Sequence, residues 1–314
     1  MSLASAAAVA PRPTDEPFRL RRTFAIISHP DAGKTTLTER LLAAAGAIQS
    51  AGAVRGKSGQ RSTRSDWMEM EQQRGISITS SVMTFDYDGL TLNLLDTPGH
   101  SDFSEDTYRT LTAVDAAIMV IDAAKGIESQ TQKLFEVCRL RDIPIITFIN
   151  KVDREGHAPL DLIDEIQGKL ALDLTPVLWP IGMGVDFFGY IDLLEKRVVT
   201  PQGKTLAEFD ALEDLLDVPE LADNAVFMTA IETLEMAQAM LPEFDLETFH
   251  AGHLSPVLFG SALKGVSVAE LLRTLGDWGP EPRPQPALPA PITPNEKKVT
   301  GFVFKVQANM DANH

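Results

Sequence analysis

The chain has 314 residues, of which 44% are hydrophobic and 23% charged, a composition typical of a globular protein with one large domain or two smaller ones. Its formal charge of −16 argues against a protein that coats nucleic acid, because that role depends on neutralising phosphates with Lys and Arg, and no DNA partner is expected. Cys138 is the single cysteine, so no internal disulfide is possible and a reducing, cytoplasmic location is expected. No apolar run has the length of a membrane span, and residues 1–17 are expected to form a disordered tail rather than a signal peptide.

Apolar, β-rich runs alternate along the chain with patterns typical of helices, which predicts βαβ units and a mostly parallel sheet flanked by helices. Asp88-Gly89 separates two β-rich runs and is a strong hairpin signal, so one antiparallel pair is expected in the otherwise parallel sheet. The alternating runs are Phe24–Ile27, Leu37–Ala45, Ala116–Ile121, Thr131–Leu140, Ile143–Ile149 and Leu160–Leu170.

A phosphate-binding loop is predicted directly after the first strand. Its glycine and lysine are followed by threonine and open a helix, so backbone N–H groups and the helix N-terminus would face a polyphosphate. Lys34 would reach the β- and γ-phosphates, and the Thr35 hydroxyl would bind Mg²⁺. Ser28 replaces the usual first glycine but is small enough for a phosphate to approach. The residues expected to bind the nucleotide here are Ser28, His29, Pro30, Asp31, Ala32, Gly33, Lys34, Thr35 and Thr36.

A second motif, Asp96-Thr97-Pro98-Gly99-His100, stands at the end of the next apolar strand. Asp96 could hold Mg²⁺ through water, and Gly99 would let a backbone N–H approach the γ-phosphate. An ordinary turn is the alternative. The phosphate loop one strand away favours the nucleotide site.

The base is expected to be read by Asn150-Lys151-Val152-Asp153, again placed after a buried strand. The Asp153 carboxylate could accept from both N1–H and the exocyclic amine of guanine, a donor pair that adenine lacks. Helix capping by Asn150 or Asp153 is the alternative interpretation. Ser261, Ala262 and Leu263 follow another strand, and their backbone is expected to contact the guanine O6.

Several boundaries are predicted from these motifs and from composition. A GTP-binding domain is expected at 18–278. The two base-reading loops are far apart in sequence, so a subdomain is expected to be inserted at about 173–252, α-rich and with an acidic face between Thr205 and Phe249. A proline-rich linker at 279–297 would lead to residues 298–314, the truncated start of a second, β-barrel type domain.

Taken together, these motifs resemble the translational GTPases. Within that family, the stretches at 65–82, 103–122 and 301–311 are similar to the bacterial peptide-chain release factors of the third type. The resemblance implies GTP or GDP and Mg²⁺ as ligands. It also implies that Ser77, with Thr79 as the fallback, supplies the Mg²⁺ ligand of the first switch, and that His100 positions the attacking water.

By the same resemblance, the ribosome, including its RNA near the GTPase centre, would activate hydrolysis in a monomeric factor. The implied function is GTP-driven dissociation of class I peptide chain release factors at translation termination. Two alternatives stay open: another ribosomal GTPase such as a relative of elongation factor G, and a non-catalytic GTP-gated binding module.

Overall fold

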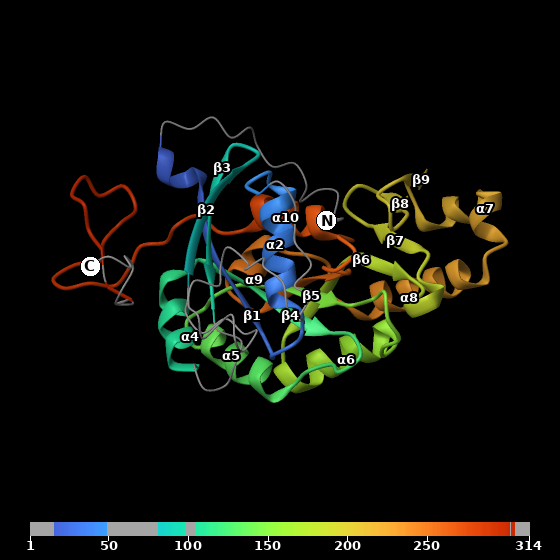
Figure 1. The fold of residues 1–314 in the computed structure, drawn as a ribbon, viewed down its shortest axis with the longest axis horizontal. Coiled ribbons are helices and arrows are strands. Elements are labelled where there is room, and N and C mark those ends of the chain that lie inside the picture. Colours follow the sequence, from blue (N-terminus) through green and yellow to red (C-terminus); the bar gives the residue numbers. More distant parts are fainter. Residues whose placement is uncertain (1–15, 49–80, 98–103, 302, 305–314) are drawn as a thin grey trace, which may run out of the picture.

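The computed structural model describes residues 16–48, 81–97, 104–301 and 303–304, and within them ten strands form one sheet (Figure 1). The order of the strands is β2-β3-β1-β4-β5-β10-β6-β7-β8-β9. They span β1 (Arg21–Ser28), β2 (Ser81–Tyr87), β3 (Leu90–Asp96), β4 (Ala116–Asp122), β5 (Ile145–Asn150), β6 (Asp173–Ile181), β7 (Gly189–Asp192), β8 (Arg197–Val199), β9 (Thr205–Glu208) and β10 (Leu254–Phe259).

The central strands form the parallel part of the sheet, as predicted. β1 pairs with β3 and β4, β5 with β4 and β10, and β10 with β6, all parallel. Every residue of β4, β5 and β10 is buried, because helices cover both faces of the sheet. Pro144 precedes β5, and the strand begins at Ile145 rather than at Ile143.

Two helical layers enclose the sheet (Figure 1). On one face, Leu37 and Leu41 share a buried apolar cluster with Leu271 and Leu275. On the other face lies a second cluster, to which α5, α6 and α8 contribute. The helices are α2 (Lys34–Ala44), α4 (Ser104–Thr110), α5 (Ser129–Arg139), α6 (Pro159–Leu170), α7 (Pro219–Ala222), α8 (Ala225–Met240), α9 (Leu246–His250) and α10 (Val268–Trp278), with 3₁₀ turns η1 (Pro17–Leu20), η3 (Leu111–Ala113), η4 (Gly184–Asp186) and η5 (Leu212–Asp217).

The prediction of one antiparallel pair was wrong. The β2–β3 hairpin turns at Asp88-Gly89 as expected, but β6–β7, β7–β8 and β8–β9 are also antiparallel. The connections between these later strands are too short for a crossover helix, so each strand must return beside its predecessor. The signal was weak because β7, β8 and β9 have only three or four residues each.

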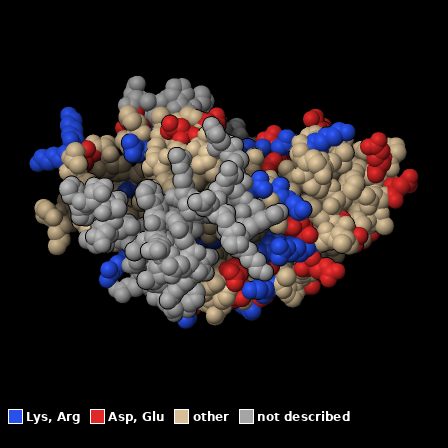
Figure 2. Space-filling view, viewed as in Figure 1, with Lys and Arg blue, Asp and Glu red and all other residues tan. Residues whose placement is uncertain are grey.

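The segment 173–252 therefore begins by extending the main sheet and only then becomes helical. Its helices η5, α7, α8 and α9 fall in the acidic stretch, where 205–249 contains no Lys or Arg. Figure 2 shows Asp and Glu side chains gathered at the end of the molecule formed by α7. Whether this segment is a subdomain of its own stays a prediction.

From Gly279 to Gly301 the proline-rich chain forms no helix and no strand beyond an isolated bridge between Gln285 and Ile292. Arg283 fastens it to the main body by donating to the Asp142 carbonyl at 2.9 Å. Of the predicted second domain at 298–314, only residues 298–301 and 303–304 are described, so that domain stays a prediction. No helix in the described part of the chain is long and apolar enough to cross a membrane.

Candidate nucleotide site

The predicted site lies at the carboxyl edge of the parallel strands. Ile26 of β1 is in register with Asp96 of β3, and Asp122 of β4 is in register with Asn150 of β5. β10, which carries the Ser261 loop, pairs with β5 although the segment 173–252 separates them in sequence. Parallel strands end at one edge, so the loops that follow β1, β3, β4, β5 and β10 meet there, where ligands of open α/β sheets bind.

Asn150, at the end of β5, joins the phosphate loop to the Ser261 loop that follows β10. Its side chain is 1% exposed; Nδ2 donates to the Ala32 carbonyl and Oδ1 accepts from the Ala262 amide, both at 2.8 Å. One amide side chain thus satisfies buried backbone groups on two loops, a function that needs both a donor and an acceptor. Helix capping, the alternative interpretation, is not what Asn150 does.

Gly33 is required by its backbone and by its neighbour. It has a φ of +103° at the N-cap of α2, and a Cβ there would lie 2.3 Å from Asn150 Nδ2. Left-handed backbone with so close a contact admits only glycine. Lys34 follows as the first residue of α2 and is 6% exposed, which places a buried lysine at the positive end of the helix.

Lys151 supports the phosphate loop through a hydrogen bond to the loop backbone. Its Nζ donates to the Asp31 carbonyl and to the Asp122 carboxylate, both at 2.6 Å. Asp122 is 5% exposed and also accepts from the Ala124 amide at 2.9 Å, so the pair is held by a buried carboxylate. In the phosphate loop itself, His29 Nε2 lies 3.2 Å from Glu128 Oε2.

Asp153 has a buried carboxylate oxygen, Oδ1, without a hydrogen-bond partner in the described structure. Buried acceptors in proteins nearly always have a hydrogen-bond partner, so an unpartnered acceptor indicates that a bound ligand supplies the donor. Guanine carries adjacent N–H donors that would meet this requirement, and the residues therefore fit that base.

Comparison with known proteins agrees with this geometry. The family model described as the elongation factor Tu GTP binding domain matches residues 19–281. The chain belongs to this family. This GTP-binding domain also resembles a solved structure from Thermus thermophilus, with a TM-score of 0.66 and 24% identity over 83% of this chain and 40% of that one, a similarity that shows a shared fold.

The GTP-binding domain has curated relatives with the name Peptide chain release factor 3. The protein from Bordetella petrii is 55% identical and that from Bordetella pertussis 54%, each over 298 residues. These residues are 94% of this chain and 56% of each relative, so the chain spans about half the length of the relatives it matches.

The Ser261 loop is held by backbone and side-chain hydrogen bonds. Ser261 is fully buried and pairs with Val266 through two backbone hydrogen bonds, while Ala262 is held by Asn150 and Leu263 is half exposed. Thr97 is buried and donates to the Ile26 carbonyl at 2.7 Å, which fixes the end of β3 to β1.

Part of the predicted site falls outside the described residues. Ser77 and its fallback Thr79, together with Pro98, Gly99 and His100, belong to it, as does the side chain of Asp96. Their predicted roles stay predictions.

Two residues of this GTP-binding domain were missed by the sequence motifs. Asp122 ends a wholly buried strand, a position where an acidic side chain is a signal for a site. Arg40 gives no such signal, since it lies within α2; its Nη2 donates to the Leu263 carbonyl at 2.7 Å and so ties the phosphate-loop helix to the base-reading loop.

Proposed function

We propose that this chain binds GTP and GDP with Mg²⁺ and hydrolyses GTP, as the nucleotide-binding part of a ribosome-activated translation factor. The observation that supports nucleotide binding best is Asn150, which joins Ala32 to Ala262 while the Asp153 carboxylate beside it keeps a buried acceptor for the base. Membership of a GTP-binding family points the same way.

The chain's own residues supply most of what hydrolysis requires. Phosphoryl transfer depends on neutralising charge on the phosphoryl oxygens and on placing a water in line. Lys34 and the N-terminus of α2 would neutralise charge, and Thr35, Ser77 and Asp96 would hold Mg²⁺, which adds positive charge when bound. His100 is proposed to orient the water, an assignment that comes from the family resemblance.

The proposed role in the cell is dissociation of class I peptide chain release factors from the ribosome after termination. It is supported by the name of relatives that are 55% and 54% identical over 94% of this chain. By the family resemblance, ribosomal RNA near the GTPase centre would be the group that orders His100.

Base recognition is tested by exchanging the carboxylate for an amide. Wild type should bind GTP and GDP but not ATP, whereas Asp153→Asn should lose guanine nucleotides and gain xanthine nucleotides, because the amide offers a donor to the xanthine O2. Isothermal titration calorimetry measures all of these. Tight ATP binding by wild type, or a uniform loss for guanine and xanthine in the variant, would refute the assignment.

The ribosomal role is tested with a chimaera in which this chain replaces the matching part of the Bordetella petrii relative. The chimaera should accelerate dissociation of class I release factors from terminated ribosomes and should not drive tRNA translocation. Translocation without release-factor dissociation would favour the elongation factor G alternative.

Single-turnover phosphate release by the chimaera, with and without ribosomes, tests the binding-module alternative. Stimulation by ribosomes identifies an enzyme, and its absence a GTP-gated binding module. His100→Ala in the same chimaera should keep GTP affinity and abolish the stimulation. Equal loss of both would remove His100 from the catalytic role.

A further inference from the structure

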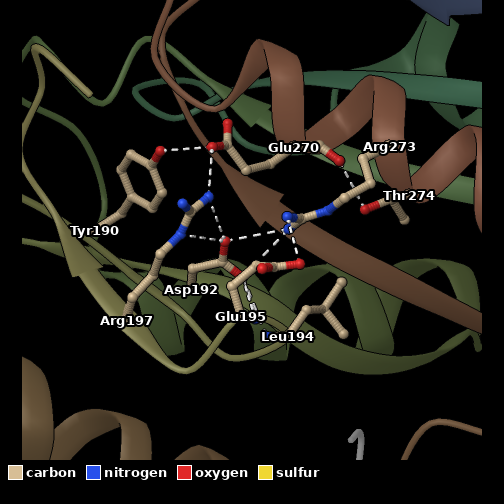
Figure 3. Close-up of polar contacts among 8 residues, drawn as sticks. All are labelled: Tyr190, Asp192, Leu194, Glu195, Arg197, Glu270, Arg273 and Thr274. Atoms are coloured by element: carbon tan, nitrogen blue, oxygen red, sulfur yellow. Dashed lines mark hydrogen bonds and ion pairs between the residues drawn. The ribbon is translucent and has the colours of Figure 1, made fainter. Parts of the chain in front are cut away.

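A group of polar and charged side chains, with Asp192 fully buried and the two arginines partly buried, joins the strand extension β7–β8 to helix α10 (Figure 3). Asp192 is fully buried and accepts from Arg273 Nη2 at 3.1 Å and from Arg197 Nη2 at 3.3 Å. Glu270 accepts from the Tyr190 hydroxyl at 2.8 Å and lies 3.6 Å from Arg197 Nη2. These five residues are called the Asp192 cluster: Tyr190, Asp192, Arg197, Glu270 and Arg273.

Asp192 has several further partners, whereas Arg273 Nε is buried without a hydrogen-bond partner in the described structure. Asp192 Oδ1 also accepts from the Leu194 and Glu195 amides at 3.1 Å, and Glu195 lies 2.8 Å from Arg273 Nη1. Burial lowers the pKa of Arg273, but Asp192, Glu195 and Glu270 together raise it, and the net shift is upward. Burial and the adjacent Glu270 raise the pKa of Tyr190. Buried charge networks are weak sources of net stability and are better suited to specifying one arrangement of the elements that they join.

In this structure the Asp192 cluster specifies the position of the loop 261–267, which follows β10. Glu270 lies in the first turn of α10, shortly after Ser267, the N-cap of the helix. The loop 261–267 closes on itself through the Ser261–Val266 hydrogen bonds, and its Ala262 amide is the one that Asn150 holds. Because α10 continues from this loop, a shift of the helix start moves the loop.

Two separate sets of contacts therefore hold the loop 261–267 and the start of α10. Arg40 of α2 holds the Leu263 carbonyl, and the Asp192 cluster holds the first turns of α10. The cluster contains no residue of the predicted nucleotide motifs, and its strand-borne members all come from the segment inserted between the two base-reading loops.

We propose that Tyr190 and Asp192 are positioning residues for guanine: through Glu270 and Arg273 they hold α10, and with it the 261–263 backbone, in the position that retains the nucleotide. The inserted strands thereby control how fast the nucleotide leaves. This inference rests on the proposed nucleotide binding. It implies that a partner that shifts β7–β8 would accelerate nucleotide exchange.

The test compares three variants on one strand. Tyr190→Phe removes only the hydroxyl that Glu270 binds, and Asp192→Asn removes the charge that both arginines share. Ile191→Val is the matched control, because Ile191 is fully buried and belongs to the apolar cluster on the opposite face of the sheet. Thermal unfolding confirms that each variant is folded and measures its loss of stability.

The readout is the dissociation rate of N-methylanthraniloyl-GDP, with the phosphorus NMR shifts of bound GDP as a second signal. Release should be roughly two- to thirtyfold faster in Tyr190→Phe and Asp192→Asn, the range for mutations that alter coupling between sites, and unchanged in Ile191→Val. The phosphate shifts should stay at their wild-type values, because the phosphate loop is not disturbed.

Wild-type release rates in folded Tyr190→Phe and Asp192→Asn would overturn the proposal. Equal acceleration in Ile191→Val would also overturn it, because the effect would then be general loosening. If Asp192→Asn does not fold, Tyr190→Phe decides alone. Failure of the wild type to bind GDP would refute the proposed function instead, so the two failures are distinguishable.

Discussion

Asn150 and Ala32 are 118 positions apart, yet the Asn150 amide donates to the Ala32 carbonyl at 2.8 Å. The same side chain accepts from Ala262, which is 112 positions away in the other direction. A single buried residue at the end of β5 thus sets the distance between the loop expected to hold the phosphates and the loop expected to hold the base.

Asn150→Ala should weaken GDP binding at least tenfold. The substitution leaves the Ala32 carbonyl and the Ala262 amide without their partner, at a cost of about 1–3 kcal/mol for each buried group, and about 1.4 kcal/mol is a tenfold change in affinity. Isothermal titration calorimetry measures it. The control is Ser255→Ala. It removes the buried 2.8 Å hydrogen bond between Thr147 of β5 and Ser255 of β10, the strands that lead to Asn150 and to the Ser261 loop. Ser255→Ala should lower the melting temperature without lowering GDP affinity, and an equal loss in both variants would contradict a specific role for Asn150.

Asp122→Asn should weaken GDP and inosine diphosphate by the same factor. Without the carboxylate, Lys151 keeps only its bond to the Asp31 carbonyl, so the phosphate loop loosens while the base contacts persist. Breaking a fully buried ion pair costs about 3–5 kcal/mol, and less is expected here because the Lys151 side chain is 23% exposed. Competition binding with GDP and inosine diphosphate gives the factor by which the affinity for each nucleotide falls relative to wild type.

Lys169→Met is the control for that experiment, because Lys169 forms an exposed pair with Glu165 at 2.7 Å on α6. Exposed pairs contribute about 0–1 kcal/mol, so its nucleotide affinities should equal those of wild type. A loss for GDP alone in Asp122→Asn would place Asp122 in base recognition rather than in support of the phosphate loop.

Arg40→Met should accelerate GDP release about threefold to tenfold, as expected when a hydrogen bond of about 1 kcal/mol that holds the Leu263 carbonyl is lost. Stopped-flow dissociation of a fluorescent GDP measures the rate. Arg139→Met removes a comparable contact, from Arg139 to the Leu170 carbonyl at 3.2 Å, and should leave the rate unchanged. Identical rates in Arg40→Met and wild type would show that Leu263 needs no support from α2.

Cys138 should report unfolding. Burial raises the pKa of its thiol from 9.0 to about 12, so the folded chain keeps the proton between these values while the unfolded chain loses it. Stability should therefore fall as pH rises above 9.0, and the thiol should react only after the chain opens. Labelling with a disulfide reagent at about pH 8 should be slow and should be slowed further by GDP. Rapid labelling of the native chain would contradict this burial.

Much of the site could be predicted from sequence because its parts are local. Gly33 and Lys34 open a helix after a buried strand, and Asn150 ends another strand that Lys151 to Asp153 follow, so each motif shows its own conformation in a few residues. The rule that parallel strands end at one edge then brings the motifs together. The short strands β7, β8 and β9 could not be predicted in this way, because three or four residues are too few to show an alternating pattern.

By itself, the sequence determined the parallel part of the sheet, the order of the nucleotide motifs and the expectation of guanine. The tertiary structure alone decided which side chains support these motifs: Lys151 with Asp122, Arg40 with Leu263, and Arg273 with Asp192. The reason is physical. Local conformation follows from neighbouring residues, whereas a hydrogen bond between residues many positions apart exists only once packing has brought their elements together.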